Sequence, residues 1–384
     1  MASIISGEEA EINGYIIEKK LGGGAYGKTY LCIKNNKKYV LKKTATLNSH
    51  GNGMEKDISD HFKEKNSYDN LFYYIEIFDY KGNKYFVSEY IGYSLSEYLY
   101  LNHHKCWEID EIINFANQMI HSLYLFHSDL IYHRDIKPGN ICIKQENEKS
   151  QKIYIIIDYG SGIIQQKTEE KKITINKTEY KDQQFGTSMY LHPKINEVIF
   201  SVKEEAEFYN ENIDIWSLGL ICLELFTGEQ LFKYETNNWQ NNQKLAKEEE
   251  YLIPFDKKKT TVEFVQFIDS MLQYEYDFQL KIEELKTLDF LNKDQKKFKI
   301  FPIEIAKKKG KYKIKDDKEY LILNFRKDLN FHYDQLLKEK EKKVSKEELI
   351  KEIFIELNEE ELFTEPVLIP LIKTEDNLYN ENNK

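Results

Sequence analysis

The sequence contains few of the residues that build disulfide frameworks, metal clusters or membrane spans. Its four cysteines lie far apart along the chain, and none of them belongs to a C-x-x-C pair. This spacing argues against structural zinc and disulfides, and it fits a reducing compartment. The most apolar stretch, residues 213–227, contains Asp214 and Glu224 and is too short to cross a bilayer. The first ten residues lack a basic segment followed by an apolar run, so no secretory signal is expected.

Positive charge is also in deficit, with 55 lysine and arginine residues against 65 aspartate and glutamate residues. The formal net charge of −10 argues against nucleic acid as a bulk partner. Hydrophobic residues nevertheless make up 41% of the chain and aromatic residues 14%, which is a globular composition. We therefore expect a soluble cytoplasmic protein without a membrane or nucleic-acid partner, while association with the cytoskeleton or another large assembly stays open.

The order of the predicted elements is strands first and helices later. Runs typical of strands occupy residues 15–21, 28–34 and 37–43, a polar helical stretch covers about 53–64, and two more strands are expected at 72–80 and 84–91. From residue 94 the pattern becomes helical, and one expected face carries Ile112, Phe115, Met119, Leu123 and Phe126. Another helix is expected at 213–226. After residue 292 a lysine-rich segment, a helical stretch at 331–357 and an acidic tail follow.

A glycine-rich segment lies between the first two predicted strands. It places Gly22, Gly24 and Gly27 in a G-x-G-x-x-G pattern, which lets backbone N–H groups approach phosphates closely. A dinucleotide-binding version of this pattern opens a helix, whereas residues 28–34 have the pattern of a strand. Fifteen residues after Gly27 a strand carries Lys42, whose ammonium would neutralise phosphate charge.

The sequence from His133 to Asn140 carries the strongest chemical signal. Asp135 would orient a substrate hydroxyl and accept its proton, and Lys137 would neutralise the transferring phosphate. Asn140 and Asp158, which ends an apolar strand in an Asp-Tyr-Gly triplet, would hold Mg²⁺ through oxygen atoms. These segments together predict phosphoryl transfer.

The four segments resemble those of the protein kinase superfamily, serine/threonine type, with some features similar to casein-kinase-one-like enzymes. The resemblance covers residues 12–292 and implies an α+β, bilobal fold with a β-rich N-lobe (12–92) and a helical C-lobe (93–292). Residues 1–11 would be a tail, and 293–384 a charged extension with a helical segment. ATP, Mg²⁺ and a protein substrate are implied. The implied ATP-binding residues are Leu21, Gly22, Gly24, Gly27, Val40, Lys42, Glu55, Ser88, Glu89, Ile91 and Cys142.

Three positions depart from the family pattern. Tyr159 replaces the usual phenylalanine after the metal-binding aspartate, and its hydroxyl needs a partner. Lys194 replaces a glutamate that pairs with an arginine, and the alignment places Gln279 at the arginine position. The glutamate that pairs with Lys42 is expected to be Glu55, because Glu55, Ile58 and Phe62 have helical spacing, with Glu64 as a substitute.

Two functions remain open at this stage. The first is an active kinase, regulated by a phosphate on Thr174, Thr178 or Tyr180 that would bind Arg134. The second is a kinase-fold scaffold, or pseudokinase, that acts by binding partners in a larger assembly. Residues 293–384 are the segment that we expect to bind such an assembly partner.

Overall fold

The computed structural model describes residues 10–24, 27–44, 49–65, 71–147, 149–166, 172–183, 185–232, 250–254, 259–292, 294–298, 312–315 and 318–324. The chain divides into two compact units. The first contains residues 1–247 and 270–298, and the second contains 248–269 and 299–384. The predicted helical stretch at 331–357, the acidic tail and residues 1–9 lie outside the described residues.

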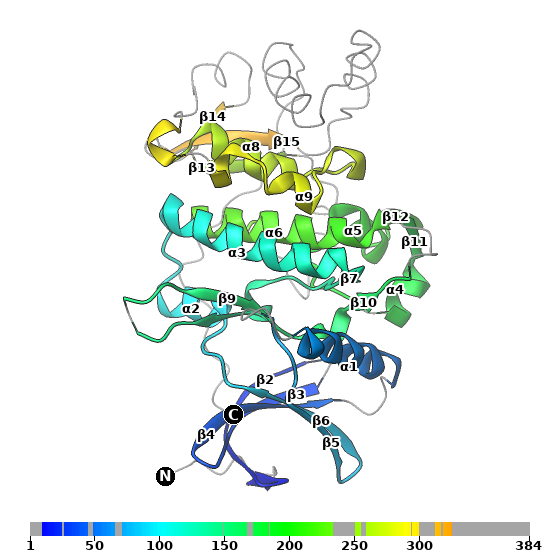
Figure 1. Ribbon diagram of the computed structural model, residues 1–384. Helices are drawn as coiled ribbons and strands as arrows, with labels where there is room; N and C mark the ends of the chain where they lie inside the picture. The colour runs from blue at the N-terminus through cyan, green and yellow to red at the C-terminus, as the bar shows by residue number, and fades with distance from the viewer. Residues whose placement is uncertain are drawn as a thin grey trace, which may run out of the picture. The chain divides into compact units, whose positions relative to one another are not determined.

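The first unit begins with a six-stranded antiparallel sheet (Figure 1). The strand order is β1-β2-β3-β4-β6-β5. The strands are β1 (Glu11–Ile12), β2 (Tyr15–Gly24), β3 (Gly27–Lys34), β4 (Lys37–Thr44), β5 (Glu76–Tyr80) and β6 (Asn83–Glu89). Two-residue turns at Asn35-Asn36 and Lys81-Gly82 have positive φ angles, which matches the right-handed twist of the hairpins they close. On one face of this sheet Tyr15, Cys32, Leu41 and neighbouring side chains form a buried cluster.

Helix α1 (Ser49–Glu64) provides the side chains that meet the loop after β9. Glu55, Ile58 and Phe62 are spaced three and four residues apart, and each is at most 2% exposed. The predicted amphipathic face is therefore the buried one, and it places a carboxylate in an apolar surrounding.

The helical part of the first unit is built around two helices that lie side by side, α3 (Ile109–Ser128) and α6 (Asn210–Thr227) (Figure 1). The five predicted face residues of α3 are all buried. The other elements are α2 (Leu95–Leu101), β7 (Ile131–Tyr132), η1 (Pro138–Asn140), β8 (Ile141–Lys144), β9 (Ile153–Ile156), η2 (Tyr159–Ser161), β10 (Ile163–Ile164), α4 (Lys177–Gln183), α5 (Pro193–Ile199), η3 (Tyr276–Phe278), α9 (Ile282–Leu285), α10 (Asp289–Asn292) and η4 (Gln295–Lys297). The predicted α+β class with a β-rich N-lobe is confirmed.

A strand pair absent from the sequence prediction joins the segment after η2 to the chain beyond α5. Strand β11 (Lys172–Asn176) pairs antiparallel with β12 (Glu205–Tyr209). Ile175 and Phe208 of this pair are fully buried in a cluster with Phe185 and Leu191. The segment from β11 to α5 therefore has a hydrophobic core.

The second unit contains a three-stranded sheet in the order β13-β15-β14. Its strands are β13 (Glu250–Pro254), β14 (Tyr312–Lys315) and β15 (Lys318–Asn324), and β15 is antiparallel to both neighbours. Helix α8 (Val262–Met271) begins in this unit. Two segments far apart in sequence thus share one sheet.

Candidate active site

Lys42 on β4 is held between two carboxylates. Its ammonium lies 2.6 Å from Glu55 Oε1 and 2.6 Å from Asp158 Oδ1. Helix α1 supplies Glu55, and the turn after β9 supplies Asp158, so the three side chains join three separate elements. The structure thus places Glu55 opposite Lys42, whereas Glu64 is exposed at the end of the helix.

The charges of this triad depend on one another. Burial opposes the charged form of Lys42, but the carboxylates of Asp158 and Glu55 outweigh it and raise the pKa of Lys42. Burial also raises the pKa of Asp158 by itself, yet Lys42 and the Gly160 N–H lower that pKa to about 2. For Glu55 burial dominates and raises the pKa, against the lowering effects of Lys42 and the Tyr74 hydroxyl. Lys42 and Asp158 are therefore both ionised at neutral pH.

The turn that carries Asp158 has an unusual backbone. Asp158 has φ 68° and ψ 84°, in the left-handed region, and its carboxylate accepts a bond from the Gly160 N–H. A Cβ atom on Gly160 would lie 3.1 Å from Asp158 Oδ1 and 3.3 Å from Lys42 Nζ. Strained non-glycine backbone is typical of functional sites, and here it directs a carboxylate into the cavity.

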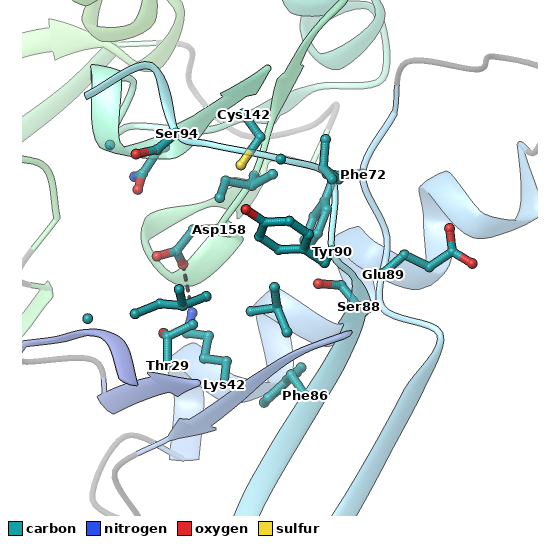
Figure 2. A pocket seen from close by; sticks show the side chains of 18 of the residues that line it. Thr29, Lys42, Phe72, Phe86, Ser88, Glu89, Tyr90, Ser94, Cys142 and Asp158 are labelled. Carbon is teal, nitrogen blue, oxygen red and sulfur yellow. Dashed lines mark hydrogen bonds and ion pairs between the residues drawn. The ribbon is translucent and has the colours of Figure 1, made fainter. Parts of the chain in front are cut away.

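A cavity of about 420 Å³ opens next to this triad. Figure 2 shows the ion pair of Lys42 and Asp158 in the cavity lining, with Ser88 and Phe86 along β6. Its lining includes ten of the thirteen predicted ATP-binding and metal-binding residues: Leu21, Gly22, Val40, Lys42, Ser88, Glu89, Ile91, Cys142, Asn140 and Asp158. Gly24, Gly27 and Glu55 are not among the lining residues that the structure describes. The cavity brings together residues that are more than 130 positions apart in sequence.

The glycine segment forms one edge of the site. Gly22 and Gly24 end β2, and Gly27 begins β3; Ala25 and Tyr26 lie outside the described residues. Gly27 has φ 131°, and a Cβ there would lie only 1.9 Å from the Lys43 carbonyl oxygen. Only glycine fits this position.

Apolar side chains also line the cavity. Val40 pairs with Ser88 across β4 and β6, and Cys142 on β8 lines the cavity as well. Burial raises the pKa of the Cys142 thiol to about 12, with a smaller effect from Glu97, so the thiol stays protonated. Apolar walls of this kind suit a flat aromatic ring, and Glu89 and Ile91 are also part of the lining.

Hydrogen bonds to Asp214 of α6 anchor the loop from His133 to Asn140. Asp214 is fully buried and accepts bonds from the backbone N–H groups of Arg134, at 2.7 Å, and His133, at 2.9 Å. His127 lies 3.1 Å from the same carboxylate. Arg134 has φ 61°, so the carboxylate stabilises a strained turn.

Asp135 is the centre of a second hydrogen-bond cluster. Lys137 Nζ lies 2.8 Å from Asp135 Oδ2, and the Thr187 hydroxyl donates to Asp135 Oδ1 at 2.7 Å. Lys137 also donates to Thr187 at 2.7 Å. Asn140 Nδ2 donates to Asp135 at the backbone oxygen (2.9 Å) and at Oδ2 (3.1 Å). These bonds fix the Asp135 carboxylate beside the ammonium of Lys137, whose side chain is partly exposed.

Comparison with known proteins identifies this arrangement. The family model described as a protein kinase domain matches residues 15–291. The chain belongs to the protein kinase superfamily. This kinase is 30% identical over 224 residues to serine/threonine-protein kinase ppk5 of Schizosaccharomyces pombe, covering 57% of the chain and 24% of that protein. It is 23% identical over 236 residues to Aurora kinase A-A of Xenopus laevis, covering 59% and 50%.

A third relative is the probable serine/threonine-protein kinase dyrk2 of Dictyostelium discoideum, 31% identical over 144 residues, or 38% of this chain and 13% of that protein. The kinase thus matches half or less of the length of each of these relatives. The predicted resemblance to the serine/threonine type is confirmed. Within the described part of the chain, no helix has the length and apolar character needed to span a bilayer.

Several residues of the site escaped the sequence prediction. Thr29, Phe72, Tyr74, Phe86 and Tyr90 line the cavity. Thr29 lies two residues after Gly27 on β3, and Phe86 lies two residues before Ser88 on β6. Strand alternation places each pair on one face of the sheet, so this pattern could have identified both residues. Phe72 and Tyr74 lie in the strand expected at 72–80, but that expectation is wrong for residues 72–75, because β5 begins only at Glu76. Strand alternation therefore does not place these two side chains at the cavity.

One expectation for the C-lobe needs correction. Lys194 does not meet Gln279: its ammonium lies 2.7 Å from Glu275, and Gln279 bonds to Asn212 and to the Met271 carbonyl. Arg134, expected to bind a phosphate, donates to the Ser161 carbonyl at 2.8 Å and covers the Phe185 ring at 4.5 Å. The partner of Lys194 is therefore Glu275, four residues before Gln279. Phosphate binding by Arg134 stays a prediction.

Proposed function

We propose that this chain is an active protein kinase that transfers the γ-phosphoryl group of ATP to serine or threonine hydroxyls of proteins. The observation that carries the proposal is the pairing of Lys42 with both Glu55 and Asp158, next to a cavity of nucleotide size. This arrangement presents one cation for phosphate oxygens and one ionised carboxylate for a metal.

The donor set suits Mg²⁺, a hard cation that prefers oxygen ligands. The Asp158 side chain is 33% exposed and its pKa of about 2 keeps it ionised. Asn140 commits its amide nitrogen to Asp135, so its amide oxygen is the atom available as a ligand. When bound, Mg²⁺ would neutralise charge on the phosphate oxygens.

The other groups act on the acceptor hydroxyl. Asp135 would accept the hydroxyl proton, and its bonds from Asn140 and Thr187 fix the carboxylate in one orientation. Lys137 would neutralise the transferring group from its position beside Asp135. A lysine two residues after this aspartate favours serine or threonine acceptors over tyrosine, on the family resemblance.

The test uses purified protein, γ-labelled ATP and a panel of generic protein substrates. Asp135→Asn should retain Mg·ATP binding and lose turnover by about 10²–10⁴-fold. Asp158→Asn should lose both Mg·ATP binding and turnover. Asp79→Asn, an exposed carboxylate of β5, is the control and should behave as wild type. Equal phosphorylation by wild type and Asp135→Asn would refute catalysis, and nucleotide binding without turnover would favour a scaffold whose partner binds residues 293–384.

A further inference from the structure

Three hydroxyl groups join the segment Phe72–Tyr74 to both carboxylate-bearing elements of the site. The Tyr74 hydroxyl donates to Glu55 Oε1 at 2.6 Å, and the Tyr74 N–H donates to Ser59 Oγ at 2.7 Å. On the other side, the Tyr159 hydroxyl donates to the Phe72 carbonyl at 2.7 Å. Tyr74, Tyr159, Glu55 and Ser59 are all at most 4% exposed.

The first bond acts on the orientation of Glu55. Its Oε1 atom accepts from Lys42 and from Tyr74, each at 2.6 Å, so a single oxygen is fixed from two directions. Hydrogen bonds to a buried carboxylate are stronger than those to neutral groups, and losing one leaves charge poorly solvated. Tyr74 thus holds Glu55 in the rotamer that reaches Lys42.

The second bond acts on the turn that carries Asp158. The Tyr159 ring packs against Phe62 of α1, against Phe72 and against Phe126 of α3, with centroid distances of 5.6–5.8 Å. A phenylalanine at this position would keep these ring contacts but would lack the bond to Phe72. The tyrosine therefore adds a directional link between the Asp158 turn and the segment before β5.

The Tyr74 ring itself borders the cavity. It packs on Phe86 at 4.9 Å and on Phe72 at 5.0 Å, and it shares the cavity lining with Ser88. Phe86 and Ser88 lie two residues apart on β6 and therefore on the same face. A side chain that both orients Glu55 and borders the cavity can couple the cavity contents to the triad.

We propose that Tyr74 and Tyr159 are positioning residues that assemble Lys42, Glu55 and Asp158 before nucleotide binds. Tyr74 acts through Glu55, and Tyr159 acts through the Asp158 turn. The inference rests on the proposed function for its kinetic consequences, but the preassembly itself is a property of the nucleotide-free protein.

The kinetic test combines Tyr74→Phe with Glu55→Gln. Tyr74→Phe should lower kcat/KM for ATP about tenfold, the scale of one hydrogen bond to a charged group, and leave the KM for the protein substrate unchanged. The double variant should be no slower than Glu55→Gln alone, because Tyr74 acts only through Glu55. Effects that multiply in the double variant would overturn the proposed role of Tyr74.

The chain offers a matched control for the loss of a buried hydroxyl. The Tyr15 hydroxyl on β2 donates to Glu76 Oε2 on β5 at 2.6 Å. Both residues belong to the six-stranded sheet and lie outside the cavity lining. Tyr15→Phe removes a bond of the same type and length. It should lower thermal stability as Tyr74→Phe does and leave kcat/KM for ATP unchanged. An equal kinetic loss in both variants would mean that Tyr74 has a purely structural role.

A second readout needs no activity. Hydrogen exchange of the nucleotide-free protein should be slow in α1 and in residues 157–162 for wild type. Tyr74→Phe should speed exchange in α1, and Tyr159→Phe should speed exchange in residues 157–162, with recovery on adding Mg²⁺ and a non-hydrolysable ATP analogue. Unchanged exchange in both variants would refute preassembly, even in an active enzyme. Faster exchange in a protein without turnover would refute the proposed function alone.

Discussion

The ion pair between Lys194 and Glu275 gives a prediction that the structure makes quantitative. The nitrogen–oxygen distance is 2.7 Å, and the side chains are 17% and 34% exposed. Lys194 also lies over the rings of Tyr276, at 4.7 Å, and Tyr274, at 5.0 Å. Partly exposed pairs contribute about 0.2–1 kcal/mol, and an exposed cation–π contact adds about 0.5–1 kcal/mol.

These terms set the expected results. Lys194→Ala should lower the free energy of unfolding by about 1–2 kcal/mol, because it loses the pair and the ring contacts. Glu275→Ala should cost about 0.5–1 kcal/mol, because the cation–π contacts survive. The double variant should show a coupling of about 0.5–1 kcal/mol, and the swap Lys194→Glu with Glu275→Lys should recover part of the loss.

The assay is denaturant unfolding of the wild type and the four variants at low salt and at 1 M salt. The coupling should fall at high salt, because screening weakens a partly exposed pair. Lys56–Asp60, an i,i+4 pair on the surface of α1, is the control and should couple by no more than about 0.5 kcal/mol. Additive effects of Lys194→Ala and Glu275→Ala would refute the assigned partner, and coupling of Lys194 to Gln279 instead would support the partner expected from the sequence.

Three further predictions follow from the site. The pKa of Asp158 is lowered to about 2, so its ion pair should stabilise the folded protein above about pH 4 and lose that contribution as pH falls toward 2; Asp158→Asn should flatten this part of an acid-unfolding curve. Asp214→Asn should abolish most turnover yet spare nucleotide binding, since its amide would face the His133 N–H donor-to-donor, and kinetics with nucleotide titration would separate the two. Phosphatase-treated protein should keep most of its activity, because Arg134 already contacts Ser161 and Phe185; Phe185→Ala should instead destabilise the fold by about 3–5 kcal/mol, measured by thermal unfolding.

Local patterns were enough to predict five of the six strands of the sheet, while the short strand β1 was missed and β5 begins four residues later than expected. Alternation placed β2 to β4, and helical spacing favoured Glu55 over Glu64 because Ile58 and Phe62 share its face. These residues are determined by short-range periodicity, which the sequence displays directly.

Contacts between distant segments were not predictable in the same way. The pairing of β11 with β12, and of β13 with β15, depends on which strands meet after folding. The pairing of Lys194 with Glu275 likewise joins residues 81 positions apart, and no local pattern selects Glu275 as the partner. Tyr74 was missed for a related reason, since its hydroxyl reaches Glu55 from a segment with no regular structure.

The shared sheet of the second unit limits how this protein can be divided. Strand β13 lies inside the region that matches the kinase family, while its partner β15 lies beyond it. A recombinant fragment ending at residue 291 would leave the β15-facing edge of β13 without its ladder, from Glu250 to Pro254. Such an edge invites pairing with other chains. Expression of the catalytic region as a separate fragment should therefore extend at least through Asn324, and chimeras that exchange the extension should carry β13 with it.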